Sequence, residues 1–179
     1  MRLLLLPSLL VVLLLAASCG GGDDQSASEQ WSSDFCSAAA DWRTSLEDTV
    51  SQFQSPSDLT AESLRTAVDD GLESTQTFVD EVRRLGPPET EAQQEAADII
   101  DSTTAEIEST ADDIRSTFDS GDDSLPSMVQ KLTQAGSQIA QMGQDLQSSL
   151  DELENLNGGE ELKDAIESNE DCDAARAGS

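Results

Sequence analysis

The spacing of the apolar residues constrains the fold more than any other feature of this chain. From Trp31 onward these residues recur three or four positions apart over four long segments. Such spacing puts them on one side of an α-helix, and no segment alternates with the period of two that a half-buried strand shows. The expected helices span about residues 32–53, 61–85, 88–118, 125–156 and 160–168.

Each expected helix has one apolar face, which we predict to be buried. In the first two helices these residues are Phe35, Ala39, Trp42, Leu46, Val50 and Phe53, then Leu64, Val68, Leu72, Phe78, Val82 and Leu85. In the third they are Ala96, Ile100, Ile107, Ala111, Ile114 and Phe118. In the fourth and fifth they are Met128, Leu132, Ala135, Ile139, Met142, Leu146, Leu150, Leu153 and Leu156, then Leu162, Ala165 and Ile166.

Local signals mark several helix ends. Ser32 or Ser33 is the expected N-cap of the first helix, because a serine oxygen accepts a hydrogen bond from a free backbone N–H. Thr60 is the expected N-cap of the second helix, and Gly86 is expected to end that helix in a left-handed conformation. The fourth helix is expected to begin at Ser124.

Four long helices with short connections predict an all-α fold, an antiparallel up-down-up-down four-helix bundle followed by a short fifth helix. We assign residues 32–175 to this domain. In this topology the start of the first helix and the end of the fourth lie at the same end of the bundle. The fifth segment can therefore bring Cys172 back to Cys36.

The first eighteen residues have the composition of an export signal. Leu3 to Ala17 form an apolar run of 15 residues, interrupted by Pro7 and preceded by Arg2. A helix of that length reaches about 22 Å, short of the ~30 Å hydrocarbon core of a bilayer. We therefore predict that residues 1–18 are a signal peptide rather than a membrane-spanning anchor.

The segment Ala16-Ala17-Ser18-Cys19 resembles the lipobox of bacterial lipoproteins, in which small residues precede a cysteine. Leucine is usual three residues before that cysteine, where this chain has Ala16. The resemblance implies cleavage before Cys19 and a diacylglycerol on its thiol, which would anchor the protein to the outer face of the cytoplasmic membrane. Two acyl chains suffice for stable anchoring. The alternative is an ordinary secretory signal followed by an unrelated cysteine.

Residues 19–31 are expected to form the lipidated N-terminus and a flexible tether. They are rich in glycine, serine and other polar residues and show no apolar period. A flexible coil of this length spans about 20 Å, enough to hold an acidic domain off the membrane surface.

Cys36 and Cys172 remain once Cys19 is assigned to the lipid. Export would place them in an oxidising compartment, where two cysteines without another free thiol are expected to form a disulfide. We therefore predict a Cys36–Cys172 disulfide, and the bundle topology agrees with it. The alternatives are two free thiols or a redox pair, although the chain contains no Cys-x-x-Cys motif.

A wider resemblance is carried by four stretches. They are Phe35-Cys36, the turn RRLGPPE over Arg83–Glu89, the Gln-, Leu- and Met-rich helix Met128–Leu156, and GGEELKDAIES before Cys172. Over about residues 35–172 the chain resembles a group of small exported or lipid-anchored actinobacterial proteins whose helical domain is bracketed by two cysteines. The resemblance implies this architecture and export, and it carries over neither an activity nor a functional residue.

Charge and composition exclude several classes of function. Asp and Glu total 37 against 9 Lys and Arg, and the net charge is -28. Such a domain repels nucleic-acid phosphates, so we expect no nucleic-acid binding. The chain has no His and no Tyr, which excludes Ser-His-Asp and Cys-His catalytic arrangements and a Glu-x-x-His di-iron site. We expect no enzymatic activity, no cofactor and no metal.

Two acidic stretches invite a metal-site interpretation that their spacing does not favour. Asp119–Asp123 has the composition of a calcium loop, but an EF-hand needs glycine at its sixth position and glutamate at its twelfth, where this chain has Ser124 and Gln130. We expect an acidic loop that breaks the helix. Asn169–Asp173 places three carboxylates beside a thiol, but a disulfide would consume that thiol, so we expect a solvated tail.

Several side chains have a structural and a functional interpretation. Trp31 and Trp42 could stack on a ligand, but we expect Trp42 in the core and Trp31 at the end of the bundle near the disulfide. Met128 and Met142 could line a lipid cavity, although at this spacing methionines are more often plain core.

Three small residues, Gly136, Ala140 and Gly143, share one face of the fourth helix. They would allow either a close helix crossing or an indentation where a partner helix docks. The sequence leaves both alternatives open.

These observations favour a non-enzymatic, lipid-anchored, extracytoplasmic protein that acts as an interaction or cell-envelope module, with a cationic or helical partner. The alternative is a carrier that holds an apolar ligand, such as a lipid, between its helices. An enzyme that uses carboxylates alone ranks third, because the predicted apolar faces contain no acid. A carrier needs a sizeable apolar cavity with an opening, whereas an interaction module is expected to be close-packed.

Overall fold

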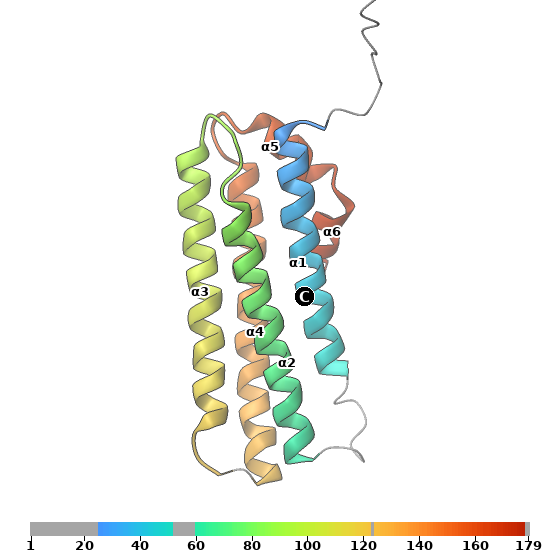
Figure 1. Cartoon of the computed structure of the whole chain (residues 1–179), viewed down its shortest axis with the longest axis vertical. Helices are drawn as coiled ribbons and strands as arrows, with labels where there is room; N and C mark the ends of the chain where they lie inside the picture. Colours follow the sequence, from blue (N-terminus) through green and yellow to red (C-terminus); the bar gives the residue numbers. More distant parts are fainter. Residues whose placement is uncertain (1–24, 52–59, 123, 178–179) are drawn as a thin grey trace, which may run out of the picture.

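The computed structural model describes residues 25–51, 60–122 and 124–177. Within these ranges the chain forms six helices and no strand: α1 (Ala27–Ser51), α2 (Ala61–Leu85), α3 (Gln93–Asp119), α4 (Leu125–Glu154), α5 (Glu160–Glu167) and α6 (Glu170–Arg176). The four long helices lie side by side and alternate in direction (Figure 1). The predicted all-α, antiparallel bundle is therefore confirmed, with α5 as its short fifth helix.

The helices of the bundle do not pack equally on one another. α1 packs closely against α2, α5 and α6, while α3 packs against α2 and α4. α5 and α6 lie at the end of the bundle where α1 begins, and α6 runs back along α1 (Figure 1). α1 and α4 are not a closely packed pair, so the edge between them is the loosest in the four-helix arrangement.

The predicted disulfide joins Cys36 of α1 to Cys172 of α6, with 4.7 Å between their Cα atoms. This bond confirms the predicted pairing in place of two free thiols, and both residues are completely buried. Ser32, one turn before Cys36, donates a hydrogen bond from Oγ to the carbonyl of Ala165 at 3.1 Å. The disulfide and this hydrogen bond together fasten α5 and α6 to the first half of α1.

Three predicted helix ends are confirmed. Thr60 caps α2 by accepting from the backbone N–H of Ser63 at 3.0 Å, and Ser63 Oγ accepts from the N–H of Thr60 in return. Gly86 ends α2 with φ of 69°, in the left-handed region that glycine adopts without strain. Ser124 precedes α4, which has Pro126 in its first turn.

The predicted start of α1 is wrong by about five residues, and the predicted tether is correspondingly too long. The helix begins at Ala27, so residues 27–31 belong to it. Ser26 and Glu29 cap it reciprocally, because Ser26 Oγ accepts from the N–H of Glu29 and the Glu29 carboxylate accepts from the N–H of Ser26. Trp31 is buried in this extra turn, where its ring stacks on that of Phe35 at 4.9 Å.

The third helix also begins later than predicted, at Gln93 rather than near Pro88. Pro88 is buried, its carbonyl accepts from the N–H of Thr90, and the carbonyl of Thr90 accepts from the N–H of Gln93. Residues 89–92 are therefore held in turns, and the acidic residues there do not lie in the first helical turn.

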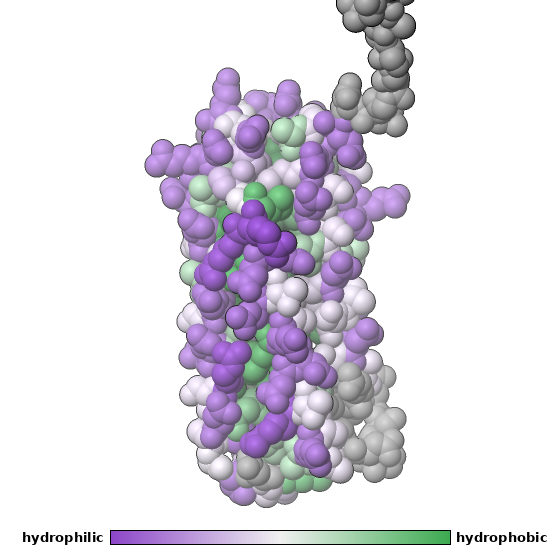
Figure 2. Space-filling model, viewed as in Figure 1, coloured by the Kyte–Doolittle hydropathy of each residue, from purple (hydrophilic) through white to green (hydrophobic). Residues whose placement is uncertain are grey.

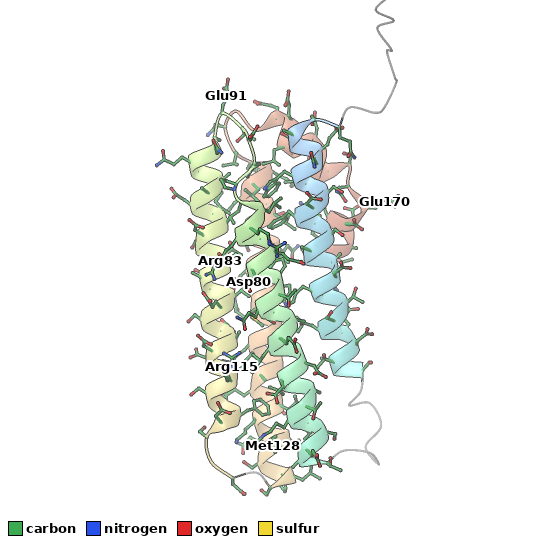
Figure 3. All side chains as sticks on the ribbon, viewed as in Figure 1. Asp80, Arg83, Glu91, Arg115, Met128 and Glu170 are labelled. Atoms are coloured by element: carbon green, nitrogen blue, oxygen red, sulfur yellow. A yellow bond between two sulfur atoms is a disulfide. The ribbon has the colours of Figure 1, made fainter. Side chains whose placement is uncertain are left out.

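The C-terminal stretch is helical rather than a solvated tail. Asn169 caps α6 by accepting from the N–H of Asp171 at 2.8 Å. Cys172 and Ala175 face inward and are buried, while Glu170 projects outward (Figure 3). Two buried positions in seven residues are too few to show an apolar period in the sequence. The helical conformation of α6 therefore depends on its tertiary contacts and on the disulfide.

The predicted apolar faces are confirmed for most residues of the core. Val50 is the exception, because it is 52% exposed in the last turn of α1. Leu85, Leu132 and Ile139 are only partly buried. Phe53 lies outside the described residues.

The two tryptophans occupy structural positions. Trp42 stacks on Phe78 at 4.7 Å between ring centroids, and its Nε1 donates to Thr75 Oγ1 at 3.0 Å. Trp31 Nε1 donates to the carbonyl of Gly86 at 2.7 Å, which fastens the start of α1 to the end of α2. Core packing, rather than stacking on a ligand, accounts for both rings.

The predicted signal peptide, residues 1–18, and the predicted lipidation site Cys19 lie outside the described residues. Both therefore stay predictions from the sequence. α1 begins at the end of the bundle that also holds α5 (Figure 1), so the chain leading from Cys19 joins the domain at that end.

Candidate functional site

The loose edge between α1 and α4 contains a groove of about 740 Å³, which we call the α1–α4 groove. Its apolar floor includes Leu46 and Val50 of α1 and Ile139 and Leu146 of α4. α6 ends at this groove, where Arg176 contributes to the lining. Val50 lines this groove, which accounts for its exposure.

A smaller cavity of about 220 Å³ adjoins the groove, and we call it the inner cavity. Its lining comes from all four long helices, including Val68 and Leu72 of α2, Ile114 of α3 and Met142 of α4. The groove and the inner cavity share Leu46, Val50 and Ile139, so they meet at these three side chains. Among the described residues that line the inner cavity, none has an ionisable side chain. Its lining consists of Leu46, Thr49, Val50, Ala67, Val68, Gly71, Leu72, Thr75, Ile114, Leu132, Ala135, Gly136, Ile139 and Met142.

The small residues of α4 face these two spaces. Gly136 lines the inner cavity, and Ala140 and Gly143 line the groove. A Cβ atom placed on either glycine would meet no neighbouring atom within 4 Å. These small residues therefore line an indentation on α4, and no other helix packs closely against them among the described residues.

The two methionines singled out from the sequence have different surroundings. Met142 is buried and lines the inner cavity. Met128 is completely buried near the opposite end of the bundle from α5 (Figure 3) and lines neither space. Only Met142 therefore belongs to the candidate site.

The rim of the groove carries charges of both signs. Arg43 of α1 donates from Nε and Nη2 to Glu47 at 2.8 Å, and from Nη1 to the carbonyls of Ala174 and Ala175 at 3.1 and 3.2 Å. These bonds hold the end of α6 against α1. Asp48 lies further along the same rim.

Arg176, the last residue of α6, lines the groove. Its Nη2 pairs with Glu154, which links α6 to α4. Its side chain is 20% exposed, and its Nε–H is buried with no acceptor among the described residues. This guanidinium is therefore incompletely satisfied at the point where the apolar floor ends.

The carboxylates with displaced pKa values lie outside this site. Arg83 of α2 reaches toward α3 (Figure 3) and donates to Glu108 at 2.7 and 3.2 Å, which lowers the pKa of Glu108 and raises that of Arg83. Both side chains are exposed. The face of the bundle seen in Figure 2 consists mainly of hydrophilic residues. The pair is a surface ion pair between α2 and α3.

The acidic loop before α4 is closed by hydrogen bonds between Asp122 and Ser124. Asp122 accepts from the backbone N–H of Ser124 at 3.0 Å and from its hydroxyl at 2.6 Å, and these bonds lower the pKa of Asp122. The ammonium of Lys131 donates to the carbonyls of Phe118 and Ser120. The expected helix-breaking loop is confirmed, and Lys131 fastens the end of α3 to α4.

Comparison of this chain with protein-family models, curated proteins and solved structures finds no match. Among the helices of residues 25–51, 60–122 and 124–177, none is both long and apolar enough to span a membrane. The same residues contain no group of three or more His, Cys, Asp or Glu side chains arranged to hold a metal ion.

Proposed function

We propose that this chain is a lipid-anchored, extracytoplasmic, non-enzymatic protein that holds an apolar ligand between its helices. The inner cavity, whose lining shares Leu46, Val50 and Ile139 with the α1–α4 groove, is the observation that carries this proposal. A close-packed bundle of four helices would bury Val50 and Ile139 against each other, whereas here both line the open edge. Concave sites with an apolar lining and a few polar groups at the mouth are typical of small-molecule binding.

The anchor in this proposal comes from the sequence, through the lipobox resemblance at Cys19. A carrier fixed to the membrane would exchange apolar ligands with that membrane without diffusing away. The net charge of -28 supports a domain that stays soluble and does not lie flat on anionic lipid.

A second candidate function, an interaction module with a helical partner, is favoured by the small residues Gly136, Ala140 and Gly143. These residues leave room along α4 on the side of the groove. An amphipathic helix that lies in the groove could insert an apolar side chain toward the inner cavity. This candidate differs from the first in its guest, not in its site.

The test is a titration of the mature domain, with Cys19 replaced by serine, with the apolar dye N-phenyl-1-naphthylamine. We expect saturable fluorescence enhancement with one site per chain. Gly136 belongs to the lining of the inner cavity and a Cβ there meets no neighbouring atom, so we expect the leucine of Gly136→Leu to occupy part of this space and dye binding to be lost. The same change raises helix propensity by about 0.7 kcal/mol, and circular dichroism of the variant checks that it remains folded.

The matched control is Ser137→Leu, which adds the same side chain to the adjacent exposed position outside both spaces. It should bind the dye as the parent does. Absence of saturable binding in the parent, or equal binding by Gly136→Leu, would contradict the proposal.

A further inference from the structure

The polar side chains that line the inner cavity are hydrogen-bonded within the protein and need no partner from a ligand. Thr75 donates from Oγ1 to the carbonyl of Gly71 at 2.8 Å and accepts from Trp42 Nε1 at 3.0 Å. Thr49 donates from Oγ1 to the carbonyl of Ser45 at 2.9 Å. These are the polar side chains of the lining, and both hydroxyls are satisfied within the protein. A polar guest would lose its hydration here without compensation, whereas a hydrocarbon would not.

The dimensions of the two spaces favour a guest with one slender end. The inner cavity, at about 220 Å³, is smaller than the roughly 300–1,000 Å³ typical of ligand pockets. It meets the groove where Leu46, Val50 and Ile139 belong to both linings. The groove, at about 740 Å³, has room for a larger and more polar end.

The charged groups are all at the mouth. Arg43 is engaged by Glu47 and by two carbonyls of α6, so it contributes little further hydrogen bonding. Asp48 adds a negative charge on the α1 side of the rim. Arg176 is paired with Glu154, yet its buried Nε–H has no acceptor among the residues the structure describes. The Arg176 side chain is 20% exposed and lines the groove, so the exposed part of its guanidinium can donate to an oxygen of a bound ligand.

We propose that the ligand is a single-chain amphiphile, with its hydrocarbon chain in the inner cavity and the acceptor oxygens of its head group at Arg176. This inference rests on the proposed function and specifies its ligand class. A fatty acid and a lysophospholipid share this chemistry, because each has one chain and an anionic oxygen head. A guest with two chains would leave the second exposed to water along the rim.

The experiment is competition against the bound dye with straight-chain fatty acids of increasing length, each used below its micelle-forming concentration. Every methylene that enters the apolar space should tighten binding about fourfold, and the gain should stop once that space is full. Primary alcohols of the same lengths serve as the neutral series. The acids should compete about tenfold better, as expected for a hydrogen bond to a charged group. Comparison of lysophosphatidylcholine and lysophosphatidylglycerol with the fatty acid of equal chain length distinguishes a lysophospholipid from a fatty acid as the ligand.

Two variants isolate the head-group contact. Arg176→Gln should remove the preference for acids over alcohols and leave the alcohols unchanged. Glu154→Gln breaks the same ion pair but keeps the guanidinium, so the preference should remain. Together they separate loss of the ion pair between α4 and α6 from loss of the ligand contact.

Several outcomes would overturn the inference and leave the proposed function standing. They are dye binding without any dependence on chain length, equal competition by acids and alcohols, or stronger competition by a compact apolar molecule such as naphthalene. Displacement by an amphipathic peptide alone would assign the groove to the helical partner. Absence of dye binding to the parent would instead remove the proposed function and the inference together.

Discussion

Removal of the disulfide should cost a large part of the stability of this domain. The bond between Cys36 and Cys172 closes a loop with a sequence separation of 136 residues. The chain-entropy model gives about 5 kcal/mol for such a loop at 25 °C, through restriction of the unfolded chain. Since engineered and native disulfides often contribute less than this model gives, we expect the double variant Cys36→Ala, Cys172→Ala to lose about 3–5 kcal/mol.

The assay is urea denaturation followed by far-ultraviolet circular dichroism, on the parent and the double variant under identical conditions. Parent protein treated with dithiothreitol is the matched control and should unfold near the midpoint of the variant. The Trp42–Phe78 stack and the aliphatic core do not depend on the bond, so the variant should remain helical in water. A loss below about 1 kcal/mol would refute the reasoning, because it would mean that the bond does not restrict the unfolded chain.

Three further changes test other parts of the account. Cys19→Ala should move the protein from the membrane fraction to the soluble fraction in the native host and remove the mass of a diacylglycerol, whereas retention in the membrane would refute the anchor. Thr75→Val should lower the free energy of unfolding by about 1–3 kcal/mol in urea denaturation, because it leaves the buried Trp42 Nε1–H without its acceptor, and an unchanged midpoint would count against this. Arg83→Gln should raise the pKa of Glu108 in a carboxyl NMR titration. Because the pKa of Glu108 is depressed in the folded state, the stability from this pair is present above the unfolded pKa and lost as the pH falls through the folded value; an unshifted titration would contradict the assignment.

The main architecture could be predicted from the sequence because its determinants are local or periodic. Leu64 to Val82 and Ala96 to Phe118 show their buried faces through spacing alone. Thr60 and Gly86 act on adjacent backbone groups, so their effect does not depend on the rest of the fold. The disulfide could be predicted from two expectations, namely export to an oxidising compartment and the bundle topology.

The start of α1 had a sequence signal that was missed. Ser26 and Glu29 have the spacing of a capping box, but they lie in a polar stretch that otherwise has the composition of a linker. The sequence of α6 shows no apolar period. This helix forms where Cys172 and Ala175 pack on α1. For α6, unlike the start of α1, the deciding contacts join residues far apart in the sequence.

The candidate site could be predicted only in part. Gly136 and Gly143 indicated an irregularity on α4, but the sequence could not choose between a close crossing and an indentation. That choice depends on the separation of α1 from α4, which the packing of α2, α3, α5 and α6 sets. The exposure of Val50 and the position of Arg176 follow from the same separation and have no local signature.

The most direct test of the central claim is native mass spectrometry of the protein released from the membranes of its own host. The account predicts one added mass per chain, matching a single-chain amphiphile and distinct from the covalent lipid on Cys19. This added mass should be absent from Gly136→Leu and present in Ser137→Leu. A parent that carries only its covalent lipid, or that comes off the membrane in a stable complex with another protein and no amphiphile, would contradict the account.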